Sequence, residues 1–422
     1  MTYVLVKNGT LIDGNGGEPI QDAAILLKDN KIKQVGRANE IRLPDEEVEI
    51  LDAENGYILP GLFDTHVHMM MEFSNLEKTV STPFSYNFYQ AIEHMKKTVN
   101  AGITSVRDAG FTDVGVKQAI ENGLVLGPRM QVSINPLTIT GGHGDSWTRS
   151  GIDTTRPTYP GMPSGLCDGP EQVRQRVREM LRAGADIIKV HATGGVMSPT
   201  DHPEFTQFSF EELSIMVEEA RFRRGIKVMA HAQGAEGVKN AVRAGIHSIE
   251  HGIYLDDEAI ELMLKHGTYL VPTLLAPVAV LEQGKNSNNM PAHAIQKALE
   301  VVDIHHESVS RAYKAGVKIA MGTDAGVMPH GVNLRELNLM CGIGMSPMES
   351  LVATTKVAAE CLGWDDKLGT VEEGKLADLV ITKVNPLSDI SALENQDNIV
   401  TVVKDGKVVK DLRVGNTNLV TQ

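Results

Sequence analysis

Cysteine is scarce in this chain, with three in 422 residues, at Cys167, Cys341 and Cys361. An odd number of widely spaced cysteines predicts neither a disulfide framework nor a cysteine-type zinc site, so we expect reduced packing residues. Long apolar runs are also lacking, and no stretch approaches the roughly 18 residues that span a membrane. The first residues do not have the basic start and the cleavage site of a secretory signal. We therefore expect a cytoplasmic protein without a membrane partner.

Clusters of basic residues are absent as well. Lysine and arginine number 40 against 54 acidic side chains, which gives a formal charge of −14. Proteins that bind nucleic acid neutralise phosphates with basic patches, so we expect no nucleic acid partner. The remaining composition, 42% hydrophobic and 22% charged, is that of an ordinary globular protein. The length allows two or three average domains, or one large α/β barrel with a smaller companion.

Both ends of the chain have the pattern of antiparallel β-structure. Residues 1–57 contain short alternating runs separated by Asn-Gly and Lys-Asp-Asn turns, which is typical of strands and hairpins. Near the other end, residues 377–382 and 399–409 alternate in the same way around an Asp-Gly hairpin turn. Neither end has enough strands to bury a sheet face alone. We therefore predict that residues 1–57 and 368–422 meet in one small β-sandwich domain.

Between these ends, residues 58–367 repeat one unit, in which a helix closes on glycine and an apolar strand follows. The glycines are expected left-handed helix caps, and they are Gly102, Gly184, Gly225, Gly245, Gly267 and Gly316. Strands that alternate with helices indicate a parallel sheet. With the strand before His66 and one near residues 130–134, the predicted strands number eight, the others being 103–108, 185–189, 226–231, 246–251, 268–273 and 317–324. The pattern predicts an α/β fold with a (β/α)8 TIM-like barrel, whose chemistry lies at the carboxyl ends of its strands.

Polar residues collect at these strand ends. His66 and His68 lie two apart, so they face the same side of a strand and can bind a metal through neutral nitrogens. A catalytic metal normally has at least three protein ligands. Other strand ends supply His231, His251 and Asp324, and the repetition of one position predicts a metal site at the barrel mouth. Three further polar residues follow strands in the same way, namely Asp108, His143 and Lys189.

Lys189 lies on an apolar strand with no acidic neighbour on its face. Burial of an unpaired ammonium is costly, so a neutral or modified amine fits this position, and so does pairing with a carboxylate from another strand. The remaining histidines are predicted to be surface or packing residues. His191 and His247 are among them because they lie one or two residues from the ligand positions, and the others are His94, His266, His293, His305, His306 and His330.

Taken together, these motifs resemble the amidohydrolase superfamily. They are most similar to its imidazolonepropionase-like branch, which contains metal-dependent Xaa-Pro dipeptidases, lysine/arginine carboxypeptidases and ochratoxin-type amidases. The resemblance covers almost the whole chain and is carried by residues 8–14, 60–68, the later strand ends and residues 369–380.

The resemblance implies a site for two divalent metal ions, with zinc expected. His66, His68 and Asp324 would hold one ion, and His231 and His251 the other. Lys189 would bridge both ions as a carbamate formed with carbon dioxide. A carbamate also answers the burial problem, because it replaces a buried cation with an anion between two cations.

The resulting hypothesis is a metal-dependent hydrolase of carbon–nitrogen bonds that acts on dipeptides or N-acyl amino acids. Two metals can generate a hydroxide near neutral pH to attack the amide, with Asp324 as proton shuttle. The resemblance favours His143 as the donor that steadies the oxyanion, while a loop-stabilising role stays open. Gln233 stands where some Xaa-Pro dipeptidases of this group have tyrosine, so a proline preference is open.

Two alternatives stay open. One is hydrolysis of a cyclic amide, carbamate or urea bond with the same metals. The other is a catalytically silent scaffold, which the complete ligand set disfavours. We expect a small-molecule amide or dipeptide substrate and a homo-oligomer.

Substrate choice is expected in the loops after the strands. The long candidates are residues 144–170, 196–208 and 276–291, together with the aromatic stretch 84–89. The aromatic side chains either line an apolar pocket or pack the loop onto the barrel.

Overall fold

The computed structural model describes residues 2–72, 76–155, 157–286 and 290–413. Its contacts divide the chain into two units. The first comprises Met1–Asp64, Lys96–Ser105 and Gly331–Gln422, and the second comprises Thr65–Met95 and Val106–His330. Every candidate site residue named above therefore belongs to the second unit.

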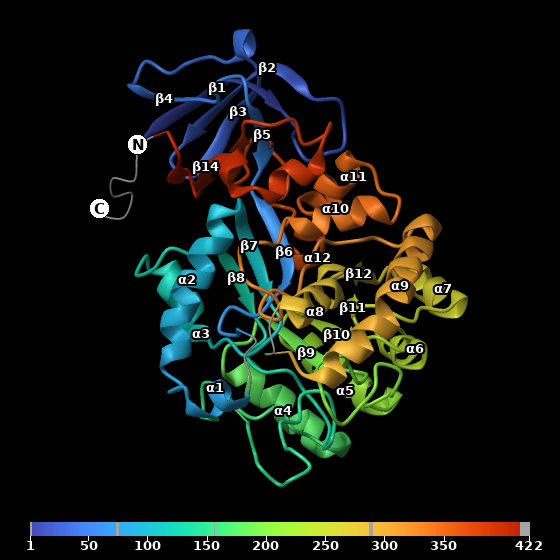
Figure 1. The fold of residues 1–422 in the computed structure, drawn as a ribbon. Helices are drawn as coiled ribbons and strands as arrows, with labels where there is room; N and C mark the ends of the chain where they lie inside the picture. The colour runs from blue at the N-terminus through green and yellow to red at the C-terminus, as the bar shows by residue number, and fades with distance from the viewer. Residues whose placement is uncertain (1, 73–75, 156, 287–289, 414–422) are drawn as a thin grey trace. The chain divides into compact units, whose positions relative to one another are not determined.

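The first unit contains a sheet built from both ends of the chain (Figure 1). Strand β13 pairs antiparallel with β5, and the order is β15-β14-β13-β5-β1-β2-β3 with β4 beside β1. The eight strands are β1 (Tyr3–Leu11), β2 (Ile20–Lys28), β3 (Lys31–Arg37), β4 (Val48–Asp52), β5 (Tyr57–Pro60), β13 (Leu379–Thr382), β14 (Ile399–Lys404) and β15 (Lys407–Asp411). Between β14 and β15, Asp405 and Gly406 have φ of 50° and 75°, which is the left-handed pair that the predicted Asp-Gly hairpin turn requires.

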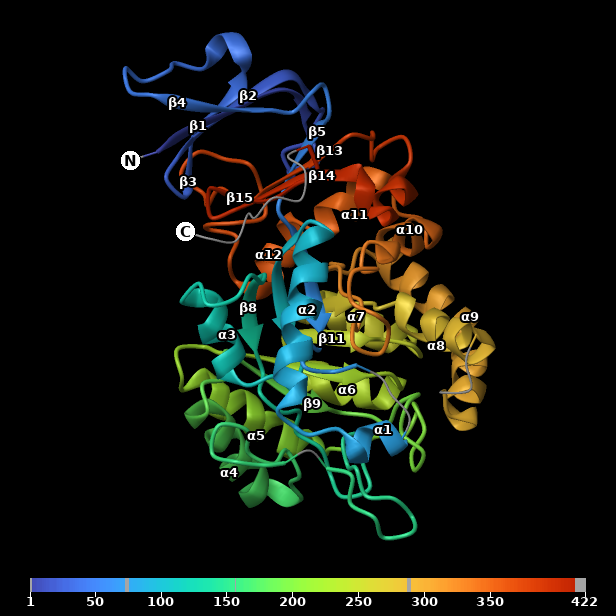
Figure 2. The same cartoon turned by 60° about the vertical axis from the view of Figure 1, so that its left-hand side comes forward.

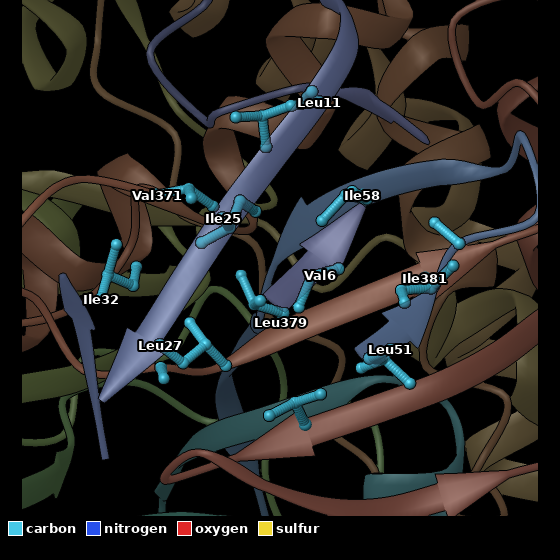
Figure 3. Close-up of a cluster of buried hydrophobic side chains, with 14 residues drawn as sticks. Val6, Leu11, Ile25, Leu27, Ile32, Leu51, Ile58, Val371, Leu379 and Ile381 are labelled. Carbon is cyan, nitrogen blue, oxygen red and sulfur yellow. The ribbon is translucent and has the colours of Figure 1, made fainter. Parts of the chain in front are cut away.

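The two faces of this sheet bury different side chains. Figure 3 shows Ile25 and Leu27 of β2 gathered with Val6 and Leu379 in one apolar cluster. The intervening residue of β2, Leu26, packs on the other face in a separate cluster. This alternation follows from the two-residue period of a strand. Helical segments complete the unit: η1 (Ala38–Glu40), α10 (Arg335–Gly342), α11 (Pro347–Ala353), α12 (Lys356–Leu362), η2 (Ile390–Glu394) and η3 (Gln396–Asn398).

The second unit is built on parallel strands. Strands β9, β10, β11 and β12 form one four-stranded sheet, and β6, β7 and β8 form a three-stranded sheet, with the residues of β6 and β7 divided between the two units. Isolated parallel bridges join Leu137 to Val190, Leu270 to Ile319 and Val67 to Ala325. The strands are β6 (Leu62–Val67), β7 (Ile103–Asp108), β8 (Arg129–Val132), β9 (Ile187–His191), β10 (Lys227–Ala232), β11 (Ser248–His251) and β12 (Tyr269–Val271).

Helices alternate with these strands, and α5 and α6 pack on β9, β10 and β11. Figure 1 labels all five elements, and Figure 2 shows α5, α6, β9 and β11 from another side. All six predicted cap glycines have positive φ, between 66° and 97°, so the prediction of left-handed positions is confirmed. None of the described helices is both long and apolar enough to cross a membrane. The helices are α1 (Leu76–Ser81), α2 (Tyr86–Asn100), α3 (Val114–Glu121), α4 (Gly169–Arg182), α5 (Phe210–Arg221), α6 (Ala235–Ala244), α7 (Asp257–His266), α8 (Leu275–Asn286) and α9 (Ala292–Ala315).

Two local predictions are corrected, and the ring contacts of the aromatic stretch bear on its two open alternatives. The stretch 317–324 is not a regular strand and has an isolated bridge at Ile319. Residues 276–291, predicted as a loop, lie mostly in α8, and 287–289 are outside the described residues. The aromatic stretch enters α2 at Tyr86, and the Phe84 ring packs edge-on against Phe88 and Tyr159, at centroid distances of 5.6 and 6.1 Å. Those contacts favour the packing role for the aromatic group.

Candidate metal centre

The structure brings the five predicted histidines of the second unit into one continuous row of rings. The centroid distances along the row are 5.4 Å from His68 to His66, 5.2 Å from His66 to His251, 4.6 Å from His251 to His231 and 4.3 Å from His231 to His143. The rings come from β6 and the residue directly after it, from β10 and β11, and from the segment after β8. These elements are far apart in sequence. Parallel strands that end at one edge account for this convergence.

Asp324 lies beside His66 and His68, at one end of the row of rings. Its Oδ1 lies 3.4 Å from His66 Nε2 and 3.1 Å from His68 Nε2. His66, His251 and Asp324 offer ligand atoms that all lie within 4.8 Å of one another, and no second such group of three occurs among the described residues. Two imidazoles and a carboxylate at this spacing suit a divalent transition metal.

His66 of β6 and His68, which follows β6 directly, are oriented by acceptors on their far side. His66 Nδ1 lies 2.7 Å from Glu250 Oε2, and His68 Nδ1 lies 3.0 Å from the Gly110 carbonyl oxygen. These acceptors take the Nδ1 hydrogen, so each Nε2 is left with its lone pair toward Asp324. Metal-binding histidines are commonly held by such partners.

The other two ligand candidates are oriented differently from each other. His251 Nδ1 lies 2.6 Å from Thr273 Oγ1, which leaves its Nε2 for the cluster. His231 instead engages Nε2 with the Gly194 carbonyl oxygen at 2.9 Å. Its Nδ1 is therefore the nitrogen available to a metal.

Two of the candidate ligands have a left-handed backbone. His251 has φ of 74° and Asp324 has φ of 65°, a conformation that is uncommon for residues other than glycine. At His251 this turn ends β11 and breaks the strict alternation of side chains, so Glu250 and His251 both contribute to the buried cluster. Such backbone conformations persist where the surrounding structure holds them, and they concentrate at functional sites.

Burial keeps the imidazoles neutral. Desolvation lowers the pKa of His66, His231 and His251 well below the usual value, and the charge of Lys189 lowers each further. Neutral imidazole is the form that binds a metal. These three histidines are therefore in their ligand form at neutral pH.

Lys189 is 2% exposed and lies on β9. Burial lowers its pKa to about 8, although the negative charges of Glu250 and Asp324 act in the opposite direction. Both predictions for this lysine therefore have support, because carboxylates from other strands act on it and burial makes its ammonium easier to deprotonate.

Glu250 is a site residue that the sequence analysis missed. Its carboxylate is fully buried and accepts hydrogen bonds from Arg107 Nη2 at 2.8 Å and Ser248 Oγ at 2.6 Å, besides its contact with His66. Its position directly before His251 in an apolar strand was the available signal. The arginine balances the buried charge, and the glutamate holds the metal-facing orientation of His66.

Replacing Arg107 by methionine should lower the free energy of unfolding by about 3–5 kcal/mol, because it leaves a buried carboxylate without its cation. Chemical denaturation of the variant measures this loss. The double variant with Glu250→Gln should recover part of the stability, since no unpaired charge is left. A double variant whose loss equals the sum of both single losses would show that the two groups do not act as a pair.

His191 was predicted to be a packing residue, and its buried ring lies beside the row. Its buried Nδ1 has no hydrogen-bond partner within the described residues, and its ring lies 4.9 Å from that of His143 and 5.3 Å from that of His231. Asp108, by contrast, holds the loop after β6: its carboxylate accepts hydrogen bonds from the Met69 and Gly110 backbone N–H groups. The Thr112 hydroxyl donates to the same carboxylate, so the contacts of Asp108 are those of a residue that holds this loop.

Comparison with known proteins gives one consistent result. The profile of the amidohydrolase family matches residues 57–409. Ochratoxinase from Aspergillus niger is 34% identical over 97% of this chain and 87% of its own length. A solved Xaa-Pro dipeptidase with methionine bound in its active site is 36% identical, covers 97% of this chain and 100% of its own, and superposes with a TM-score of 0.88. A prolidase solved with N-methylphosphonate-L-proline is 32% identical over 97% and 100% of the two chains, with a TM-score of 0.89.

These similarities confirm the resemblance drawn from the sequence. They also show that the parallel strands and helices of the second unit have the α/β architecture of a TIM-like barrel.

Proposed function

Because this chain belongs to the amidohydrolase family and is a hydrolase of amide bonds, we propose that it cleaves dipeptides or N-acyl amino acids at a binuclear metal centre. The observation that carries the proposal is the convergence of His66, His251 and Asp324, whose ligand atoms lie within 4.8 Å. The row of rings extends this group to His68 and His231. Three protein ligands are enough for one metal ion. The five residues together, with His68 and His231 included, are enough for two ions.

We assign His66, His68 and Asp324 to one ion and His231 and His251 to the other, with Lys189 as a bridging carbamate. Zinc is the expected metal. The low exposure of Lys189 and its pKa of about 8 support the carbamate, because only a neutral amine can add to carbon dioxide. Conversion to an anion would also remove the cost of burying an ammonium.

Divalent ions in such a centre acidify water and polarise a substrate carbonyl. Asp324 accepts the proton of the attacking water and delivers it to the leaving nitrogen. Its position supports this role, since Oδ1 lies between His66 and His68. His143, at the far end of the row, faces the substrate carbonyl oxygen and steadies the charge that develops there.

The similarity to an ochratoxinase and to a Xaa-Pro dipeptidase supports amides of amino acids as the substrate class. Gln233 follows His231 on the mouth side of β10 and is 5% exposed. Its Oε1 has no hydrogen-bond partner within the described residues, so it is free to accept one from a substrate N–H group. Some Xaa-Pro dipeptidases of this group have a tyrosine at this position, and its hydroxyl could donate a hydrogen bond, whereas the Gln233 oxygen can only accept one. We therefore assign no proline preference to this chain.

The test is metal analysis followed by a substrate panel. The purified chain should contain about two divalent ions, and it should hydrolyse members of a dipeptide and N-acyl amino acid library. Cyclic amides, carbamates and ureas form a second arm of the panel, and turnover confined to that arm would replace the proposed substrate class. A chain that takes up no metal would instead be a silent scaffold.

The family also supports finer points of architecture that we propose here. These are a closed (β/α)8 barrel over residues 58–367 and a β-sandwich formed by residues 1–57 and 368–422. A homo-oligomeric assembly and a cytoplasmic location stay predictions, which size-exclusion chromatography and cell fractionation test.

A further inference from the structure

Lys297 is a buried lysine of the second unit that the proposed chemistry does not use. It comes from α9, is 8% exposed, and its ammonium donates to the carbonyl oxygens of Gly195 at 2.5 Å, Ser198 at 2.7 Å and Asp201 at 3.0 Å. All three acceptors lie in the segment that follows β9. One side chain therefore satisfies three carbonyls of a turn that has no regular secondary structure of its own.

The turn held by Lys297 carries a chain of hydrogen bonds to His143. Ser198 Oγ lies 2.8 Å from His143 Nδ1, and the same hydroxyl donates to Asp201 Oδ1. Asp201 Oδ2 lies 3.7 Å from His143 Nδ1. Burial alone would raise the pKa of the Asp201 carboxyl, but hydrogen bonds from His143 and Ser198 hold the pKa well below the usual range.

The direction of these hydrogen bonds fixes the tautomer of His143. An ionised carboxylate only accepts hydrogen bonds, so the Ser198 hydroxyl donates its hydrogen to Asp201. The Ser198 oxygen is then an acceptor toward His143, and Nδ1 must carry a hydrogen. His143 Nε2 is then the nitrogen without a hydrogen, and the face of the ring stacks on His231 with planes 23° apart.

The backbone of His143 is held by the same turn. Gln207 Oε1 accepts from the His143 N–H at 3.1 Å, and Gln207 Nε2 donates to Asp201 Oδ2 at 3.0 Å. The ring also lies close to the backbone of Gly195, because a Cβ atom built at this glycine would lie 2.2 Å from His143 Cε1. The imidazole therefore has little freedom to move away from the position that Ser198 and Asp201 give it.

We propose that Asp201 and Lys297 are positioning residues that hold His143 over the metal centre in one orientation and one tautomer. Lys297 shapes the turn, Asp201 orders Ser198, and Ser198 orients the ring. The inference rests on the proposed function, since His143 matters to turnover only if an amide is cleaved beside it.

A double-mutant cycle tests the proposal. Asp201→Asn should lower kcat by about 10- to 100-fold, because small misplacements of a catalytic group cost this much, with KM nearly unchanged. In a His143→Asn background the same substitution should change kcat by less than about threefold, since groups that act as a unit are not additive. An undiminished effect of Asp201→Asn in that background would overturn the proposal. If the wild-type protein binds no metal or cleaves no amide, the proposed function fails instead.

A second arm follows the imidazole directly and does not depend on activity. Nitrogen NMR of the full chain should show the His143 Nδ1–H tautomer in the wild type and in Lys297→Arg, and its loss or exchange broadening in Lys297→Met. An unchanged His143 signal in a folded Lys297→Met variant would contradict the role of the lysine. Asp256→Asn is the matched control, because Asp256 also pairs with a lysine and caps α7 in the same unit, and it should leave kcat and the His143 signal unchanged.

Discussion

Replacing Asp324 by asparagine should lower kcat by about 10²- to 10⁴-fold, the range that a positioned acid–base group contributes. The substitution keeps an oxygen that can face His66 and His68 but removes the ability to accept a proton. Asparagine also tolerates the left-handed backbone of this position, where φ is 65°. The metal content should therefore stay near that of the wild type. Steady-state kinetics and metal analysis of the same preparation measure both quantities.

The matched control for this variant is Asp186→Asn. Asp186 pairs with Lys117 at 2.7 Å just before β9 begins, so it lies at the amino ends of the strands, away from the chemistry. Its substitution should cost some stability and leave kcat nearly unchanged. Near-normal turnover of Asp324→Asn would assign the proton transfer to another group.

The positions of the ligand candidates were predictable because they depend on local patterns. A short apolar run that ends in a polar residue marks the carboxyl end of a barrel strand, and this rule located His66, His231, His251 and Asp324 in one cluster. The cap glycines followed from local chain geometry in the same way. Such features need no knowledge of distant partners.

The features that were missed depend on contacts between distant segments. Glu250 alternates away from His251 in an ideal strand, yet both side chains lie next to His66 where the backbone of His251 is left-handed. Lys297 reaches carbonyls that lie about 100 residues earlier in the chain, and no local pattern marks that pairing. The stretch 317–324 has an apolar strand pattern, yet its pairing in the structure is reduced to an isolated bridge.

Replacing Lys189 by alanine should abolish most turnover and reduce the metal content from about two ions to about one or fewer. The reason is that the proposed carbamate is the only ligand shared by both ions. The loss of kcat should exceed the ~10- to 100-fold that substitutions around metal ligands cost. Acetate or propionate should restore part of the activity and of the metal content, because a small carboxylate fits the space left by the side chain and supplies the bridging oxygens.

Lys410→Met separates this effect from the general cost of losing a buried lysine. Lys410 belongs to the first unit, its pKa is also lowered to about 8 by burial, and its ammonium donates to the Asn100 and Gln396 carbonyl oxygens. Its loss should reduce stability without changing the metal content, and carboxylates should have no effect on it. NMR of wild-type protein supplied with isotopically labelled carbon dioxide should show a carbamate carbon that Lys189→Ala lacks. If Lys189→Ala kept its metal and its turnover, the lysine would be an ordinary buried cation paired with Glu250 and Asp324, and the two ions would have to be held without a bridge from β9.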